Sequence, residues 1–215
     1  MPEQDTVWNP QTELGRKVAR GETTSIESAL KQDRPIMEPE IVDQLVDLSE
    51  EVILIGGTPG KGGGKRRTVT KRTCRMHKSG GRYSSKSMVA LGNYRNIVGI
   101  GEGTAGGTRA AIEAATREAK LNLMEVEKGN GSWEDTGEDN SSIPFQVSGK
   151  AGGVEVELKP APRGTGLAAG DGVSKLLELA GIENIWVQSR GQTRTRGNQI
   201  KAAFNALKKI DEMKR

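Results

Sequence analysis

Apolar residues alternate with polar residues most clearly in the C-terminal third of the chain. They occupy every second position in residues 143–147 and again in residues 154–158. A period of two is typical of half-buried β-strands, because successive side chains point to opposite faces of a sheet. The two segments therefore predict a pair of strands, and the apolar run at 185–188 predicts a third strand.

Helical periodicity separates and follows these strands. Residues 173–180 predict a helix that ends at Gly181, because glycine readily adopts the left-handed conformation found after helix C-termini. A last helix is predicted to place four apolar side chains on one face, namely Ile200, Ala203, Phe204 and Leu207. The predicted order of this unit, residues 142–215, is β-β-α-β-α.

An earlier unit combines strands and a helix in a similar way. Residues 87–91 and 96–100 predict two strands joined by a hairpin turn around 92–95. A helix is then predicted from Gly106 to about Met124. Its apolar stripe consists of Ile112, Ala115, Ala119 and Leu123.

The first fifty residues predict short helices on an arm. Asn9 followed by Pro10 suits a helix start, because Asn caps helices and Pro fits the first helical position. Thr24 and Glu27 have the spacing of a capping box, and a third helix is predicted to begin at Pro39. Helices this short are unstable in isolation, so we expect them to pack on a neighbouring surface.

Two segments lack hydrophobic periodicity. Residues 56–64, GGTPGKGGG, predict a mobile loop, because ordering glycine costs much backbone entropy. Residues 129–140 are rich in Gly, Asp and Glu and predict a linker. The sequence thus predicts an α+β fold with two small domains, divided into a helical extension (1–50), a first domain (51–128), a linker (129–141) and a second domain (142–215).

Charge is distributed very unevenly along the chain. The formal net charge is only +4, yet the window between Glu51 and Glu102 contains eleven Lys and Arg residues and no acid. The first 51 residues have the opposite bias, with five cations against twelve carboxylates. Cations interleaved with Gly, Ser and Thr indicate a surface that binds a polyanion such as nucleic acid, and the alternative is a solvated, disordered basic loop.

The remaining composition excludes several protein classes. Cys74 is the only cysteine, so no disulfide framework is possible and a reducing compartment is expected. The N-terminus is polar and acidic, and no apolar run is long enough to cross a bilayer. We therefore expect a soluble, cytoplasmic protein with no membrane partner.

Two segments of the second unit combine glycine with Arg and hydroxyl residues, PAPRGTGL at 160–167 and SRGQTRT at 189–195. Glycine allows close backbone approach, and Arg and hydroxyl groups suit phosphate and 2′-OH groups. Each segment could equally be structural, since PAPRGTGL also fits a rigid turn that leads into a helix.

Taken together, these segments resemble the archaeal and eukaryotic branch of the family of small ribosomal subunit protein five. The resemblance covers nearly the whole chain. It rests on WNPQTELGRKVARG (8–21), EPEIVDQL (38–45), CRMHKSGGRYSSKSMVALGN (74–93), IPFQVSGKAGGVEVELKPAPRGTGL (143–167) and AGIENIWVQSRGQTRT (180–195).

The resemblance implies an N-terminal domain similar to double-stranded-RNA-binding modules and a C-terminal domain with a βαβ crossover. It implies a ribosome-bound structural protein that binds ribosomal RNA and contacts neighbouring proteins three, four and eight near the messenger entry path. It also implies a contribution to decoding accuracy. No catalysis, cofactor or small-molecule substrate belongs to this role.

Candidate RNA-binding residues follow from this resemblance and from the basic window. The family's hairpin segment corresponds here to Arg75, Ser79, Gly80, Arg82 and Lys86. The basic window adds Lys65, Arg66, Arg67, Lys71, Arg72 and Lys78, and the two C-terminal motifs add Arg163, Gly164, Arg190, Thr193 and Arg194.

The chain also departs from the family pattern. Gly81 stands where the family usually has a second basic residue, and residues 56–72 are richer in Gly, Lys and Arg than the strand expected there. Some archaeal relatives carry cysteines after the position of Trp133, where this chain has acids at 134–139. With one cysteine and one histidine, His77, the chain is not expected to hold structural zinc.

Rival interpretations remain at the sequence level. Residues 101–106, GEGTAG, have the spacing of a dinucleotide-binding loop, but no second strand ending in an acid follows, so we interpret them as a bend between strand and helix. Gly64 and Lys65 only approach a P-loop, because Arg66 replaces the required Ser or Thr. The chain is therefore not expected to be an enzyme, and an RNA-binding protein that acts off the ribosome is the main alternative.

Overall fold

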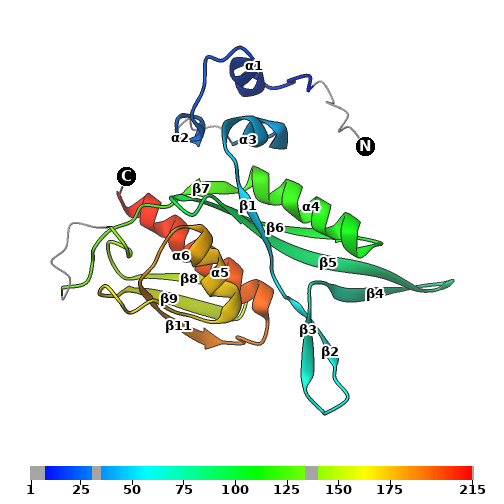
Figure 1. Ribbon diagram of the computed structural model, residues 1–215. Helices are drawn as coiled ribbons and strands as arrows, with labels where there is room; N and C mark the ends of the chain where they lie inside the picture. Colours follow the sequence, from blue (N-terminus) through cyan, green and yellow to red (C-terminus); the bar gives the residue numbers. More distant parts are fainter. Residues whose placement is uncertain (1–7, 31–34, 134–139, 215) are drawn as a thin grey trace.

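The computed structural model describes residues 8–30, 35–133 and 140–214. Three short helices form an N-terminal arm: α1 (Glu13–Ala19), α2 (Ile26–Leu30) and α3 (Pro39–Leu45). Figure 1 shows this arm above two β-sheets that are stacked with helices between and above them. None of the described helices is both long and apolar enough to cross a membrane.

Two of the predicted helix starts are wrong by a few residues. Helix α1 begins after Thr12, whose side chain accepts a hydrogen bond from the Gly15 amide, and not at Pro10. At α2 the Ser25 hydroxyl accepts the Ser28 amide at 3.4 Å, so Ser25 takes the place predicted for Thr24. The third start is confirmed, because Pro39 is the first residue of α3.

The arm packs on the N-terminal sheet, as its short helices require. Val18, Ile26, Ile41 and Val42 form an apolar cluster with Ile97 of the sheet. This cluster buries side chains that the isolated helices would leave in water. Tertiary packing therefore provides the stability that helices of this length lack in isolation.

The N-terminal sheet is antiparallel, with strand order β1-β5-β6-β7. Its strands are β1 (Ser49–Val52), β5 (Gly80–Gly92), β6 (Ile97–Ala105) and β7 (Leu123–Glu125), and β4 (Lys71–His77) pairs with the outer half of β5. The predicted hairpin between β5 and β6 is confirmed, although both strands are longer than predicted. The predicted helix is α4 (Thr108–Leu121), and it ends before β7, which the sequence pattern missed.

The glycine-rich segment is not the loop that its composition predicts. β2 (Gly56–Pro59) pairs with β3 (Lys65–Thr68) in a separate two-stranded hairpin. Only residues 60–64 form its turn. Neither strand has the apolar alternation that reveals a half-buried strand, because both are almost fully exposed and are joined by backbone hydrogen bonds.

The interpretation of residues 101–106 as a bend is also wrong. Gly101 and Gly103 lie inside β6, where α4 packs against the sheet. A Cβ at Gly101 would lie 2.1 Å from the Ala115 carbonyl oxygen, and one at Gly103 would lie 2.1 Å from that of Ala111. These glycines serve close helix–sheet packing inside an antiparallel strand, which removes the dinucleotide-loop interpretation.

The C-terminal sheet has strand order β10-β11-β9-β8. It comprises β8 (Val147–Ala151), β9 (Val154–Pro160), β10 (Leu167–Ala168) and β11 (Ile185–Gly191). In the chain, α5 (Asp171–Leu179) lies between β10 and β11, and α6 (Arg196–Lys214) follows β11. The first strand begins at Val147 and not at Ile143, and β10 is added to the predicted order. The predicted end of α5 is confirmed, because Gly181 has φ +72°.

One hydrophobic core joins the two sheets. Met88 and Ile100 of the N-terminal sheet belong to the same buried cluster as Leu176 and Leu177 of α5 and Ile200 of α6. Helix α4 covers the other face of the N-terminal sheet, where Ala111, Ala115 and Ala119 are fully buried. The layers therefore run α4, N-terminal sheet, α5 with α6, and C-terminal sheet (Figure 1).

A polar cluster reinforces this junction around Glu102. The Glu102 carboxylate accepts from Lys86 of β5 and from Lys201 of α6, with both Nζ atoms 2.7 Å from Oε2. Partial burial raises the pKa of the Glu102 carboxyl, but the hydrogen bonds and charges of Lys201 and Lys86 lower it by more, so the pKa lies below its usual 4.5. One carboxylate thus links the strand that carries the basic window to the last helix.

We predict that Gly101→Ala strongly destabilises the fold, by about 1–3 kcal/mol or more, because α4 must move away from β6. The matched control is Gly106→Ala, since an added Cβ there meets nothing within 4 Å. Urea denaturation of both variants measures the difference. Equal midpoints for the two variants would show that α4 can move without loss of stability and would contradict the prediction.

We predict that Glu102→Gln lowers stability at neutral pH and that this difference disappears in acid. The carboxyl pKa is lower in the folded state, so its stabilising effect is present above the unfolded pKa near 4.5 and is lost as the pH falls through the folded pKa. Urea midpoints of wild type and variant at neutral pH and below pH 4.5 test this. The control is Glu118→Gln, at an exposed position of α4. A difference that does not change with pH would contradict the prediction.

Candidate nucleic-acid interface

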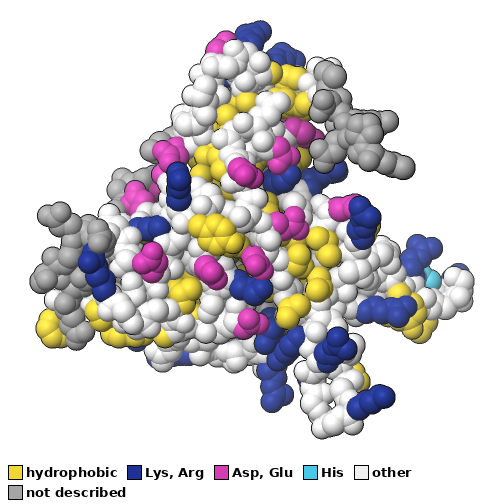
Figure 2. All heavy atoms as spheres, in the orientation of Figure 1, with side chains coloured by type: hydrophobic (Ala, Val, Ile, Leu, Met, Phe, Trp, Pro, Cys, Tyr) yellow, Lys and Arg dark blue, Asp and Glu magenta, His cyan; other side chains and the backbone are white. Residues whose placement is uncertain are grey.

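Two hairpins that project from the N-terminal sheet carry most of the basic window. They are the β2–β3 hairpin (56–68) and the β4–β5 hairpin (71–86), and neither contains an acidic residue. Figure 2 shows Lys and Arg side chains on both hairpins at the lower right, with no Asp or Glu side chain among them. We call these two segments the basic hairpins.

The β4–β5 hairpin has two chemically different faces because its side chains alternate. Like charges lie directly opposite each other on one face, where Lys71 pairs with Lys86 and Arg75 pairs with Arg82. Such pairs are destabilising in a sheet, so Arg75 and Arg82 do not stabilise the hairpin itself. A bound polyanion would relieve the repulsion between Arg75 and Arg82.

The opposite face of this hairpin is apolar and aromatic. Tyr83 is 56% exposed and Met76 is 80% exposed, and the Arg72 guanidinium lies 4.3 Å from the centroid of the Tyr83 ring. Exposed aromatic rings and Arg planes are surfaces on which unpaired bases stack. Tyr83 and Met76 were not among the sequence-predicted residues. The period of two along β4 and β5, counted from Arg72, would have placed them on one face.

The predicted residues Lys78, Ser79 and Gly80 form the end of this hairpin. Lys78 and Ser79 are exposed between the strands, and Gly80 has φ +114°. That backbone conformation favours glycine, so Gly80 has a structural role in the turn in addition to the close approach predicted for it.

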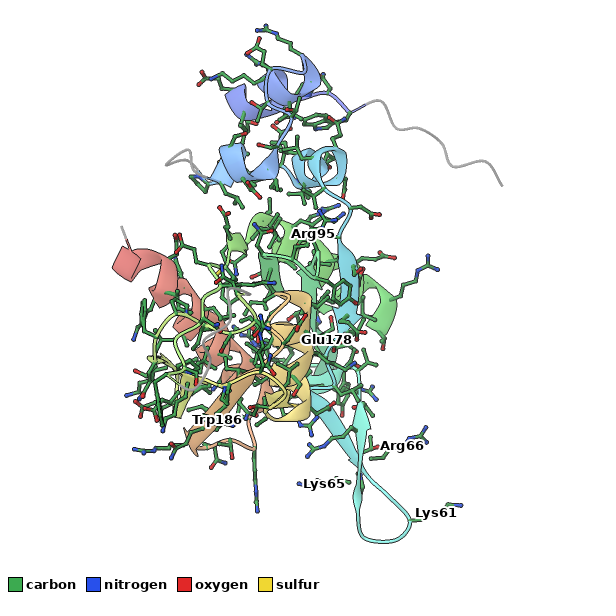
Figure 3. All side chains as sticks on the ribbon, turned by 60° about the vertical axis from the view of Figure 1, so that its left-hand side comes forward. Lys61, Lys65, Arg66, Arg95, Glu178 and Trp186 are labelled. Carbon is green, nitrogen blue, oxygen red and sulfur yellow. The ribbon has the colours of Figure 1, made fainter. Side chains whose placement is uncertain are left out.

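The β2–β3 hairpin carries three predicted residues, Lys65, Arg66 and Arg67, all of them exposed. Figure 3 shows Lys65 and Arg66 on opposite sides of the hairpin and Lys61 near its end. Cations therefore surround this hairpin and do not form a single row.

A groove of about 610 Å³ lies between the basic hairpins and the start of α6. Lys71 and Arg72 line it from β4, and Arg194 lines it from the segment before α6. Arg196, the first residue of α6, lines it as well. Residues more than one hundred positions apart thus form one basic surface. The structure places the predicted Arg194 beside the N-terminal basic window.

Lys86 also lines this groove but is not a free cation, since its Nζ lies 2.7 Å from the Glu102 carboxylate. Arg196 donates to the Leu54 carbonyl at 3.3 Å and to Asp171 at 3.4 Å. These two cations hold the walls of the groove together. The groove also has three exposed cations, namely Lys71, Arg72 and Arg194.

The other predicted C-terminal residues lie outside this groove. Arg163 and Gly164 are in the loop between β9 and β10, beside Ser141 and Glu183 at a separate hollow of about 460 Å³. This loop is a turn, because the Thr165 amide donates to the Pro162 carbonyl at 3.3 Å and Gly164 has φ +82°.

Arg190 and Thr193 belong to structured segments as well. Arg190 lies opposite Glu155 in the pairing of β11 with β9. The Thr193 amide donates to the Gly191 carbonyl at 2.9 Å in a tight turn. The structure therefore brings together the basic hairpins and Arg194, but not Arg163 or Arg190.

The described side chains offer little for metal binding or acid–base chemistry at this surface. In the ranges that the structure describes, no three His, Cys, Asp or Glu side chains gather closely enough to hold a metal ion. Cys74 is exposed on β4. The acids at 134–139 lie outside the described residues.

Comparison with known proteins agrees with this arrangement. A family profile described as "Ribosomal protein S5, N-terminal domain" matches residues 65–127, and one described as "Ribosomal protein S5, C-terminal domain" matches residues 149–215. The first profile ends after β7, and the second begins within β8. The mixed α+β structure thus contains two domains that correspond to the two profiles.

Proteins named "Small ribosomal subunit protein uS5" are similar to this chain over nearly its whole length. The one from Haloarcula marismortui is 44% identical over 95% of this chain and 90% of its own length. The one from Ignicoccus hospitalis is 45% identical over 94% of this chain and 89% of its own. The one from Methanothermobacter thermautotrophicus is 41% identical over 96% of this chain and 89% of its own.

Identity at this level over such coverage, together with both profile matches, confirms the resemblance drawn from the sequence motifs: the chain belongs to the ribosomal protein S5 family.

Proposed function

We propose that this chain is a structural component of the small ribosomal subunit that binds ribosomal RNA through the basic hairpins. Its relatives are small-subunit ribosomal proteins by name, and their family is not a family of enzymes, which confirms the prediction that the chain has no catalytic role. The observation that carries the proposal is the pair of exposed, acid-free hairpins.

Electrostatics supports RNA as the ligand of these hairpins. Phosphate contacts from Lys and Arg supply most of the affinity of nucleic-acid binding, because each contact releases condensed counterions. Arg75 and Arg82 face each other across the strands with no acid on either strand. Such a surface is more stable when phosphates lie between its cations.

The basic hairpins also offer more than phosphate contacts. The face formed by Arg72, Met76 and Tyr83 is suited to stack on an unpaired base, whereas the opposite face is suited to phosphates. We propose that the β4–β5 hairpin inserts between an RNA backbone and an adjacent unstacked base. The groove with Arg194 would continue the contact onto the C-terminal domain.

The finer assignments also belong to this proposal. They are an N-terminal domain similar to double-stranded-RNA-binding modules and the division into extension, domains and linker at 1–50, 51–128, 129–141 and 142–215. They further include a position near the messenger entry path beside proteins three, four and eight, a contribution to decoding accuracy and a cytoplasmic location. Membership in the family supports them.

We predict a steep salt dependence for binding of this protein to small-subunit ribosomal RNA. If about six cations neutralise phosphates, the slope of log K against log salt is about −4 to −5. Filter binding or fluorescence anisotropy across a salt series measures it. A slope near zero would contradict an electrostatic interface.

We predict that Arg82→Glu lowers RNA affinity by about tenfold or more and leaves the fold intact, because Arg82 is exposed and the new carboxylate faces Arg75. Arg163→Ala should have a smaller effect. Lys208→Glu, an equal charge reversal at an exposed position of α6, is the control.

Thermal unfolding followed by circular dichroism separates folding from binding in these variants. Loss of cooperative unfolding in Arg82→Glu would make Arg82 a structural residue. A larger loss of RNA affinity in Arg163→Ala would move the main interface to the loop between β9 and β10.

A further inference from the structure

A second surface lies on the side of β5 that is opposite to β6. There α3 and β1 meet α4. Two adjoining hollows of about 390 and 340 Å³ form one groove there. They share Asp43 of α3, Glu50 of β1, and Thr116 and Lys120 of α4. The groove thus runs between the N-terminal arm and the helix that covers the sheet.

The groove combines an apolar floor with an acidic rim. Its apolar side chains are Leu45, Val46, Leu48, Leu91 and Ile112. Five carboxylates and two cations line it, which gives a formal charge of −3: Glu40, Asp43, Asp47, Glu50 and Glu113 against Arg117 and Lys120. This charge repels phosphate and attracts a cationic ligand.

Part of the acidic rim is already satisfied within the protein. Lys120 lies 2.6 Å from Asp43, and the Thr116 hydroxyl donates to Glu50 at 2.9 Å. Glu40 and Asp47 are exposed and form no ion pair within the part of the chain that the structure describes. These two carboxylates remain available to cations of a partner.

An open sheet edge adjoins the groove. In the described sheet, β1 is the terminal strand and pairs only with β5. The Ile53 amide donates to the Met88 carbonyl at 3.0 Å, so the alternation of an antiparallel ladder directs the N–H and C=O groups of Glu50 and Val52 away from β5. Unpaired edges of this kind bind extended peptides by strand addition.

We propose that this groove binds an extended, basic polypeptide segment of a partner protein, which pairs with the open edge of β1. Successive side chains of a strand point to opposite faces, so every second residue of the segment would face the groove. There an apolar residue would contact Leu48 or Ile112, and a Lys or Arg would reach Glu40 or Asp47. This interaction is independent of RNA binding by the basic hairpins, because the two surfaces carry opposite charge.

The experiment uses the full chain and an array of ten-residue peptides of Lys with Val, Ile or Leu, in which both residue types occupy the every-second positions that share one face. Matched arrays replace Lys by Glu, or carry N-methyl groups on every second amide so that they cannot donate along one edge. Affinities are measured by fluorescence anisotropy with wild type, with the double variant Glu40→Lys and Asp47→Lys, and with the control double variant Glu22→Lys and Glu178→Lys. The control residues are exposed and lie outside the groove.

We expect Lys peptides to bind wild type and the control, and to bind the groove variant at least about tenfold more weakly. Glu peptides should not bind, N-methylated Lys peptides should bind at least about tenfold more weakly, and bound peptide should slow hydrogen exchange at the Glu50 and Val52 amides. Ribosomal RNA affinity of the groove variant should equal that of the control double variant, which carries the same added charge. This comparison keeps the test separate from that of the RNA interface.

Three results would overturn the proposal. The first is that no Lys peptide of the array binds wild type, and the second is that the groove variant and the control weaken binding equally. The third is that an oligouridylate RNA competes for the groove, which would make its ligand a nucleic acid. Equal binding of N-methylated peptides would overturn the strand-addition part.

Discussion

The close approach of helices to sheets is the constraint on which the rest of this structure depends. Only 3% of the residues are aromatic, so aliphatic side chains form most of the core. In addition, glycines of the strands lie directly against alanine-rich helices. Gly101 faces Ala115, and Gly149 of β8 faces Ala202 of α6, each with a carbonyl oxygen 2.1 Å from where a Cβ would stand. Dispersion contacts grow as backbones approach, so these positions add to the packing of both domains.

This close packing also fixes how the functional surfaces are presented. The N-terminal sheet is held between α4 and the helices of the C-terminal domain, and the buried cluster that joins Met88 to Leu176 leaves the two sheets one shared core. The basic hairpins extend from this layered base. Because Glu102 connects β5 to α6, the groove cation Arg194 keeps its position beside Lys71.

Charge is separated in space as it is along the chain. Arg75 and Arg82 repel each other within the β4–β5 hairpin and have no acid on either strand, whereas the groove between the arm and α4 has an acidic rim over apolar side chains. Opposite potentials at separate surfaces allow one small protein to bind RNA at one and a basic protein segment at the other. The N-terminal sheet supports the β4–β5 hairpin and the acidic groove, and the β2–β3 hairpin is a separate two-stranded sheet.

Local sequence signals were strong enough to predict the α+β class, the hairpin of β5 and β6, the helix end at Gly181, and the family through its motifs. The sequence also located the basic residues. Tertiary structure alone decided that β2 and β3 form a strand pair, that Gly101 lies inside a strand, and that Arg194 joins the basic hairpins while Arg163 does not. The physical reason is that periodicity and capping report on a residue's near neighbours, whereas exposed strand pairing, close glycine packing and converging cations depend on segments that meet only after the chain has folded.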